Sequence, residues 1–223
     1  MIDDTAIIIP AYNEGPVIAG VIKAVKKEFK NVVCVNDGSK DQTAVFATEA
    51  GADTLSHLTN IGQGGALETG IKYALMNPDI KYFVTFDADG QHRLEDVKMM
   101  LAEIKKGEHD IIIGSRFITN TTKIPPLKRQ VLKLAVLFTK ATVGLKLTDT
   151  HNGLRVFNRK FANEVNLKNF GMAHASEFLE IIKKNKFMYK EVPITVEYTE
   201  YSKSKGQPII NAVNIVFDLM FRG

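Results

Sequence analysis

The amino-acid sequence predicts an α/β domain with a mostly parallel sheet flanked by helices. Short apolar runs of strand length end in loops rich in Asp, Asn and Gly, residues that favour turns. Patterns of helical periodicity separate these runs, so strand and helix alternate as a doubly wound sheet requires. We therefore expect the carboxyl ends of the strands to share one edge, which is where such sheets bind ligands.

Each predicted strand is a run of mainly β-branched or aromatic residues. The runs are Ile7–Ile9, Val32–Val35, Tyr82–Phe86 and Asp110–Gly114. Helical patterns fill the intervals at about residues 16–29, 41–50, 64–76 and 93–106. The glycine-rich stretch Asn60–Ala66 precedes the third helix and lets backbone N–H groups approach a ligand, although turn geometry alone also explains it.

Two carboxylates, Asp87 and Asp89, stand where the run Tyr82–Phe86 gives way to a polar loop. Carboxylate oxygens at this position suit Mg²⁺ or Mn²⁺ beside a nucleotide pyrophosphate, and Gln91 can add a neutral oxygen. A simple turn after the strand is the alternative interpretation. The expected metal ligands are therefore Asp87, Asp89 and Gln91.

Three motifs in order carry a resemblance to a known family. They are Pro10-Ala11-Tyr12-Asn13-Glu14, Val35-Asn36-Asp37-Gly38-Ser39 and Asp87-Ala88-Asp89-Gly90-Gln91. The chain resembles the family 2 glycosyltransferases of GT-A fold from about Ile7 to Gln207. Through its third motif, Gly114-Ser115-Arg116 and the segment Asp149–Arg155, it is most similar to the dolichyl-phosphate mannose synthase and polyprenyl-phosphate glycosyltransferase branch.

The resemblance implies a site for a nucleoside diphosphate sugar. Its implied contacts are Pro10, Tyr12, Glu14, Asp37, Gly62, Asp87 and Ala88, with Pro10 and Tyr12 as a wall against the base. Taken alone, Glu14 also fits a helix-start carboxylate and Asp37 a turn former. Many relatives carry Lys where Gln63 stands, so this chain lacks that cation.

Three arginines, Arg116, Arg129 and Arg155, are the predicted acceptor-side residues. Planar guanidinium groups bind phosphate through paired, charge-assisted hydrogen bonds, so three of them in one cleft suit a phosphate acceptor. Surface ion pairs are the alternative for each.

The acceptor also decides whether a general base is needed. A phosphate monoester arrives already anionic, whereas a sugar hydroxyl needs a residue to remove its proton. The candidate bases are Asp149, His174 and Glu177. The remaining histidines, His57, His92, His109 and His151, show no metal-ligand spacing, so we interpret them as surface or packing residues.

Composition fits one such domain. At 223 residues and 45% hydrophobic content the chain can bury a sizeable core. The net charge of +4 and pI near 9.0 fit anionic substrates or an anionic membrane surface, but are too small to indicate nucleic acid. Cys34 is alone in an apolar run, which indicates core packing and a reducing compartment. We expect no signal peptide and no membrane span, which needs roughly 20 apolar residues.

Membrane contact is expected from two apolar helices. Residues 208–223 form the predicted second unit after the domain 1–207, and they can lie in the membrane interface. The helix at 127–145 carries several basic residues and can serve likewise. Packing of both helices on the core is the alternative. We expect a peripheral protein on the cytoplasmic face of the membrane, with a second copy or a small membrane protein as a further partner.

The predicted function is metal-dependent, inverting transfer of a hexosyl or N-acetylhexosaminyl group to a polyprenyl phosphate such as undecaprenyl or dolichyl phosphate. Asp89, Arg116, Arg129 and Arg155 would carry the chemistry. One alternative is transfer to a saccharide hydroxyl in cell-surface polysaccharide synthesis. Another is a nucleotidyltransferase-like or nucleotide-sugar-binding protein. The sugar and the base are not determined.

Overall fold

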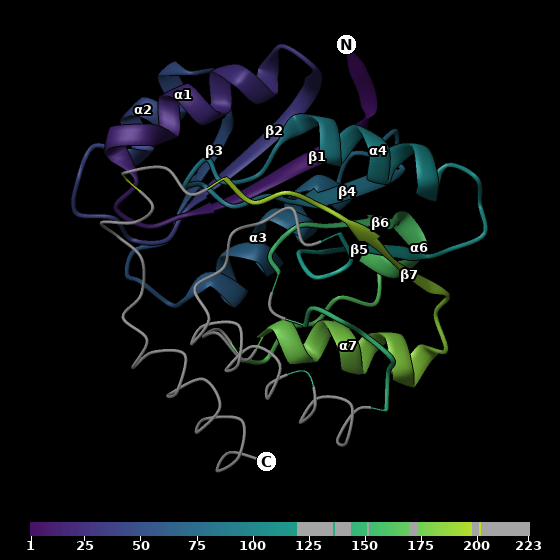
Figure 1. Cartoon of the computed structure of the whole chain (residues 1–223). Helices are drawn as coiled ribbons and strands as arrows, with labels where there is room; N and C mark the ends of the chain where they lie inside the picture. Colours follow the sequence, from purple (N-terminus) through teal and green to yellow (C-terminus); the bar gives the residue numbers. More distant parts are fainter. Residues whose placement is uncertain (120–135, 137–143, 151, 170–173, 198–200, 202–223) are drawn as a thin grey trace.

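The computed structural model of the chain describes residues 1–119, 136, 144–150, 152–169, 174–197 and 201 (Figure 1). The strands in this part are β1 (Ile2–Ala11), β2 (Phe29–Asn36), β3 (Asp53–Ser56), β4 (Tyr82–Thr85), β5 (Ile111–Ser115), β6 (Arg155–Asn158) and β7 (Tyr189–Pro193). The helices are α1 (Gly15–Lys26), α2 (Thr43–Glu49), α3 (Gln63–Leu75), α4 (Leu94–Ile104), α6 (Arg159–Ala162) and α7 (His174–Asn185).

The strands form one sheet in the order β3-β2-β1-β4-β6-β5-β7. β6 runs antiparallel to both of its neighbours, β4 and β5, whereas the other neighbouring pairs are parallel. The predicted mostly parallel sheet is therefore confirmed. The antiparallel strand β6 lies between the four strands that include those preceding the three motifs and the pair β5 and β7.

The register of the parallel pairs brings the ends of β1, β2 and β4 to one edge. Ala11 pairs with Asn36, and Ile8 pairs with Thr85, the last residue of β4. Because these strands point the same way, the loops that follow them leave the sheet together. The predicted meeting of the three acidic loops is confirmed.

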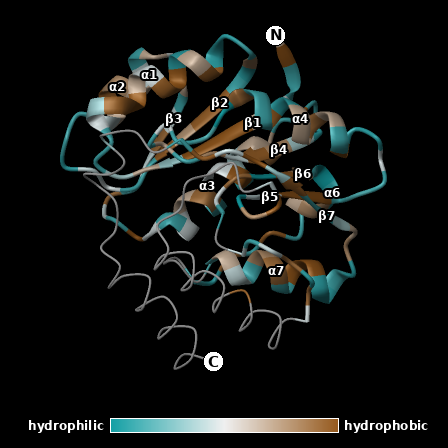
Figure 2. Cartoon of the chain, viewed as in Figure 1, coloured by the Kyte–Doolittle hydropathy of each residue, from teal (hydrophilic) through white to brown (hydrophobic). Residues whose placement is uncertain are grey.

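Helices cover both faces of the sheet (Figure 1). Side chains of α1, α2 and α4 pack on one face in a cluster with Ile7, Ile9 and Cys34. Those of α3, α6 and α7 pack on the other face with Ile8 and Phe83. The alternation of Ile7, Ile8 and Ile9 between the clusters is the period of a strand buried on both faces. Figure 2 shows the resulting apolar strands between helices whose outer sides are hydrophilic.

Some elements differ from the sequence prediction. β1 is longer than the apolar run Ile7–Ile9, because Ile2 already pairs with Phe29 ahead of an irregularity in the register. β3 was not predicted, and it pairs only with β2 at the edge, so its residues are half exposed and show no apolar run. Cys34 is fully buried in β2, as expected for core packing.

The predicted terminal helix at 208–223 lies outside the described residues, as does the helix at 127–145 except at positions 136, 144 and 145. The predicted boundary between residues 207 and 208 is likewise untested. In the described part of the chain, no helix is both long enough and apolar enough to cross a membrane.

Candidate functional site

The loops after β1 and β2 are joined by hydrogen bonds into one rim. The N–H of Asn13 donates to Oγ of Ser39 at 2.9 Å, and the N–H of Lys40 donates to Oδ1 of Asn13 at 2.9 Å. The N–H of Glu14 donates to Oγ1 of Thr43 at 2.8 Å. Asn13 adopts the left-handed backbone region, with φ of 52°. The first two motifs therefore form a single structural unit.

Asp37 lies under this rim, only 2% exposed. Its Oδ1 is 2.7 Å from Nδ1 of His57 and accepts from the N–H of Ile61 at 3.0 Å, while Oδ2 accepts from the N–H of Gly62 at 2.8 Å. Gly62 has φ of 106°, which favours glycine there. A carboxylate offers about four acceptor positions, so Asp37 has most of its capacity committed to holding the glycine-rich loop.

Asp87 follows β4 and is held from two sides. Its Oδ2 is 2.9 Å from Nε2 of His92, and its Oδ1 accepts from Nε2 of Gln63 at 3.1 Å. Burial raises the pKa of Asp87, but the His92 hydrogen bond and the charges of Arg155 and His174 outweigh it and lower the pKa below the usual value. Asp87 is therefore a fixed anion at this edge.

Gly153 lies directly against the Asp87 carboxylate. A Cβ built on Gly153 would lie 2.5 Å from Oδ2 and 2.7 Å from Oδ1 of Asp87. The carbonyl oxygen of Gly153 accepts a hydrogen bond from Oγ1 of Thr85 at 2.5 Å, which anchors it to β4. Only glycine leaves room for Asp87 at this position.

Asp89 is the second carboxylate of the loop, and buried Ala88 separates it from Asp87. Oδ1 of Asp89 accepts from the N–H of Gln91 at 3.0 Å, and Oδ2 accepts from Nε2 of Gln91 at 2.7 Å. Burial and then the charge of Asp87 raise the pKa of Asp89 to about 6. Two carboxylates that repel one another, with an amide oxygen alongside, form the hard-oxygen set that fits Mg²⁺ or Mn²⁺.

The residues after β7 pair with the loop that carries Asp89. Val196 forms an antiparallel bridge with His92, and the N–H of Glu197 donates to the carbonyl oxygen of Gln91 at 3.0 Å. A segment far along the chain therefore fixes the backbone of the predicted metal loop.

The other predicted nucleotide contacts, Pro10, Tyr12 and Glu14, differ in how exposed they are and in what they contact. Pro10 is buried within β1, whereas Tyr12 is 42% exposed at the edge. Glu14 is the N-cap residue of α1, and its side chain does not cap the helix. Its Oε2 instead accepts a hydrogen bond from the hydroxyl of Tyr201 at 2.8 Å.

Sequence reasoning missed the roles of His57, His92 and Tyr201. The two histidines were interpreted as surface or packing residues, but they contact Asp37 and Asp87. His92 does pack against Phe86, so that part of the interpretation is confirmed. The position of His92 directly after the third motif was the available signal. No sequence pattern around Tyr201 indicated its role.

These observations agree with the comparison with known proteins. The model of the family described as glycosyl transferase family 2 matches residues 6–165. The chain belongs to glycosyl transferase family 2. It is therefore a glycosyltransferase, and the GT-A fold expected from its motifs is confirmed.

Two relatives and one solved structure show what this chain is similar to. The UDP-N-acetylglucosamine–dolichyl-phosphate N-acetylglucosaminyltransferase of Methanococcus voltae is 33% identical over 96% of this chain and 94% of its own. The polyprenol monophosphomannose synthase of Mycolicibacterium smegmatis is 30% identical over 98% and 88%. Glucosyl-3-phosphoglycerate synthase from Mycobacterium tuberculosis, solved with Mn²⁺, uridine diphosphate and phosphoglyceric acid, is 15% identical, with a TM-score of 0.73 over 98% and 78%. That last likeness concerns the fold alone.

On the predicted acceptor side of this family 2 enzyme, Arg116 forms a two-pronged ion pair. Its Nε donates to Oδ2 of Asp149 at 2.6 Å and its Nη2 donates to Oδ1 at 2.7 Å. Asp149 is 1% exposed, and it accepts a further bond from the backbone N–H of Arg116 at 3.1 Å. Such a pair fixes the plane of the guanidinium.

Arg155 does not lie where a ligand could contact it. The residue is 2% exposed in β6, with its guanidinium carbon 4.8 Å from the ring centre of Phe178. Burial lowers its pKa to about 10, against the charges of Asp87 and Asp149. The predicted contact with an acceptor phosphate does not fit this placement, because β6 pairs between β4 and β5 and is covered by α7. Arg129, the third predicted arginine, lies outside the described residues.

Two of the candidate general bases are engaged in structural contacts. Glu177 lies in the first turn of α7 and accepts hydrogen bonds from the backbone N–H groups of Lys168 and Asn169, which precede the helix. Asp149 is paired with Arg116 and is buried. The third candidate, His174, is 4% exposed, and its charge contributes to lowering the pKa of Asp87.

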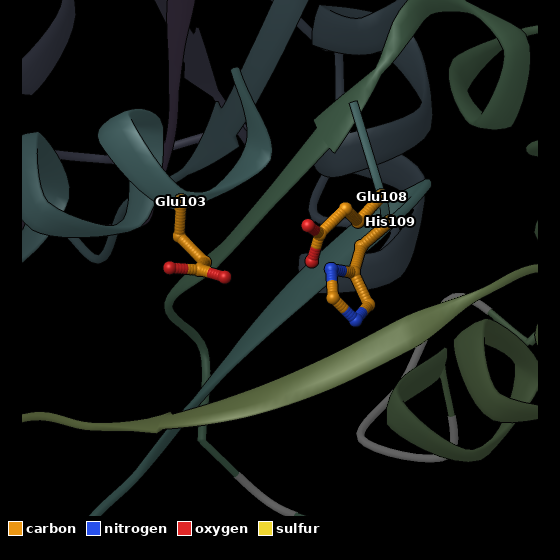
Figure 3. Close-up of side chains that lie close together, drawn as sticks. All are labelled: Glu103, Glu108 and His109. Atoms are coloured by element: carbon orange, nitrogen blue, oxygen red, sulfur yellow. The ribbon is translucent and has the colours of Figure 1, made fainter. Parts of the chain in front are cut away.

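Figure 3 shows a different group of metal-capable side chains, none of which belongs to the three motifs. Among the described residues, Glu103, Glu108 and His109 form the one set of at least three such side chains whose ligand atoms lie within 4.8 Å of one another. Glu103 accepts hydrogen bonds from Lys106 at 2.7 Å and Lys190 at 2.8 Å, which together lower its pKa to about 2. These lysines already neutralise the group, which precedes β5 at the opposite edge of the sheet.

Proposed function

We propose that this enzyme transfers a sugar from a nucleoside diphosphate sugar to a polyprenyl phosphate. The observation that carries the proposal is the pair Asp87 and Asp89 at the rim formed by the first two motifs. The acceptor class is supported by the relatives from Methanococcus voltae and Mycolicibacterium smegmatis, whose names state dolichyl phosphate and polyprenol monophosphomannose.

The donor end of the proposed site uses the rim around the first two motifs. Glu14 would face the nucleoside, and buried Asp37 would hold the glycine-rich loop beneath it. The carboxylates of Asp87 and Asp89 would lie beside the pyrophosphate. Asp89 and Gln91, helped by Asp87, would hold Mg²⁺ or Mn²⁺. The bound cation would neutralise the charge that develops on the leaving nucleoside diphosphate.

The acceptor is inferred from the state of the candidate bases. A hydroxyl acceptor requires a positioned base, but Asp149 is bound to Arg116 and Glu177 to backbone N–H groups. A phosphate acceptor is already anionic near neutral pH and requires holding, not deprotonation. Transfer to a phosphate is therefore compatible with Asp149 and Glu177 remaining in their structural contacts.

In the proposed reaction, an oxygen of the acceptor phosphate attacks the anomeric carbon from the face opposite the nucleotide, so the configuration inverts. The bond from that carbon to the nucleoside diphosphate breaks, and the electron pair leaves with the diphosphate. We assign the holding of the acceptor phosphate to Arg116, oriented by Asp149, and to Arg129. Arg155 acts from beneath, where its charge helps to keep Asp87 ionised.

The lipid acceptor also supports a peripheral location at a membrane surface. The chain has a net charge of +4, and its apolar run 208–221 is preceded by Lys203 and Lys205 and followed by Arg222. Binding to vesicles that contain anionic lipid, tested with the full chain and with a chain ending at residue 207, would measure the contribution of this segment.

The test of the proposed function is an acceptor and donor panel. Purified enzyme with Mn²⁺ is given UDP-N-acetylglucosamine, UDP-glucose or GDP-mannose together with a short polyprenyl phosphate or a free saccharide. We expect a glycosylated polyprenyl phosphate from at least one donor. Transfer only to the free saccharide would overturn the acceptor assignment, and release of pyrophosphate from a nucleoside triphosphate would instead indicate a nucleotidyltransferase.

A further inference from the structure

The ring of His92 is enclosed beside the predicted metal site. Its side chain is 3% exposed, and it packs edge-on against Phe86 with ring centres 5.5 Å apart and planes at 65°. Its Nε2 lies 2.9 Å from Oδ2 of Asp87. The ring therefore has one orientation, and that orientation presents a donor to the carboxylate.

The backbone of His92 is held as firmly as its ring. Val196 bridges it in antiparallel fashion, and Glu197 donates to the carbonyl oxygen of the preceding Gln91. Phe86 extends the strand β4 by donating its N–H to the carbonyl oxygen of Ile8 at 2.9 Å. The loop that carries Asp87 and Asp89 is therefore held at both ends, by β1 at Phe86 and by the segment after β7 at His92.

The hydrogen-bond inventory selects the tautomer of His92. In the described part of the chain, Nδ1 of His92 is buried and has no hydrogen-bond partner. A proton on Nε2 satisfies Asp87 and leaves at Nδ1 only an acceptor without a partner. The opposite tautomer would turn an acceptor toward the carboxylate and leave a buried N–H unsatisfied, which is the costlier arrangement.

We propose that His92 is a positioning residue that fixes the rotation of the Asp87 carboxylate for binding of the metal–nucleotide donor. The terminal torsion of an aspartate is soft, so its oxygens need outside partners to hold one orientation. Gln63 holds Oδ1 and His92 holds Oδ2, while the backbone of Gly153 limits movement on a third side. This inference rests on the proposed function, because it concerns the donor site of that reaction.

The test uses two variants that differ by one methylene group. The amide nitrogen of His92→Gln can reach the position of Nε2, whereas that of His92→Asn ends near the position of Nδ1 and falls short of Asp87. Substitution of a residue that hydrogen-bonds to a metal ligand typically lowers metal affinity by about 10- to 100-fold. We expect Mn²⁺ to bind in the presence of UDP at least about 10-fold more weakly to His92→Asn, and within about 3-fold of wild type to His92→Gln.

Binding is measured by electron paramagnetic resonance of Mn²⁺ and by calorimetry, with thermal melting as the check on folding. His109→Gln, outside the donor site, is the matched histidine control and should bind as wild type does. Equal affinity in all variants would overturn the role of His92, as would equal weakening by Gln and Asn. If His92→Asn does not fold, His92→Phe, which keeps a ring against Phe86, takes its place. Failure of the wild type to bind Mn²⁺ with UDP would instead count against the proposed donor site.

Discussion

The hydroxyl of Tyr201 donates a hydrogen bond of 2.8 Å to Oε2 of Glu14, across 187 positions of the sequence. Glu14 belongs to the first motif and precedes α1, whereas Tyr201 follows the segment that pairs with the predicted metal loop. The same hydroxyl lies 3.4 Å from the carbonyl oxygen of Asn13. The C-terminal part of the described chain is therefore tied to the predicted nucleotide rim.

Tyr201→Phe should weaken the binding of UDP by about 5-fold, because a hydrogen bond that orients Glu14 is worth about 1 kcal/mol. Isothermal titration calorimetry measures this affinity directly. Tyr73→Phe is the matched control, since Tyr73 lies on the exposed side of α3 and should leave the affinity unchanged. Unchanged affinity in Tyr201→Phe would mean that the contact does not serve the nucleotide.

Asp89→Asn should lower turnover by at least about 10²-fold, because it removes a charge where the leaving pyrophosphate needs a bound cation. EDTA should do the same to the wild-type enzyme, and added Mn²⁺ or Mg²⁺ should restore it. Glu103→Gln alters the other group of metal-capable side chains and should remain active and EDTA-sensitive. Full activity of the wild type in EDTA would exclude a metal at Asp89.

Gly153→Ala should impair donor binding, because the new Cβ would lie 2.5 Å from Oδ2 of Asp87 and displace the carboxylate. We expect UDP affinity in the presence of Mn²⁺ to fall by about 10-fold or more, because a metal ligand that is turned away from its orientation binds the ion more weakly. Gly20→Ala is the control: a Cβ at Gly20 in α1 meets nothing within 4 Å, and it should raise stability by up to about 1 kcal/mol. Donor titrations and melting curves of both variants test this, and normal binding by Gly153→Ala would contradict it.

Glu177→Gln should keep turnover with polyprenyl phosphate within about 3-fold of wild type, since a phosphate nucleophile needs no base. Glu177 accepts bonds from Lys168 and Asn169, and a glutamine oxygen can still accept from these N–H groups. Steady-state rates at saturating donor are the measurement. A loss of about 10²-fold or more, with normal melting, would favour a hydroxyl acceptor.

Cys34 should make stability depend on pH in the alkaline range. Burial raises the pKa of its thiol from the ordinary value of 9.0 to about 12. Between these values the unfolded chain releases the proton while the folded chain keeps it, so the contribution of Cys34 to stability falls as pH rises above 9.0. The free energy of unfolding of wild type minus that of Cys34→Ala should shrink by about 1.4 kcal/mol per pH unit there. Urea titrations at a series of pH values check this, and a constant difference would contradict it.

The sequence by itself determined the features that depend on local pattern. The runs Ile7–Ile9 and Val32–Val35 predict buried strands because every side chain in them is apolar, and the polar loops behind them mark where each strand ends. Parallel strands then place their loops at one edge without further information. The sequence alone therefore predicts that Asp87 and Asp89 lie together at that edge.

Only the tertiary structure decided which distant side chains complete the site. Arg155 looked like a phosphate ligand in the sequence, yet the antiparallel insertion of β6 buries it against Phe178. His92 and Tyr201 reach Asp87 and Glu14 through orientations set by packing and by the path of the segment after β7. A strand or helix pattern records which residues are buried, but not what they touch, because a contact depends on the relative placement of elements that the chain brings together only on folding.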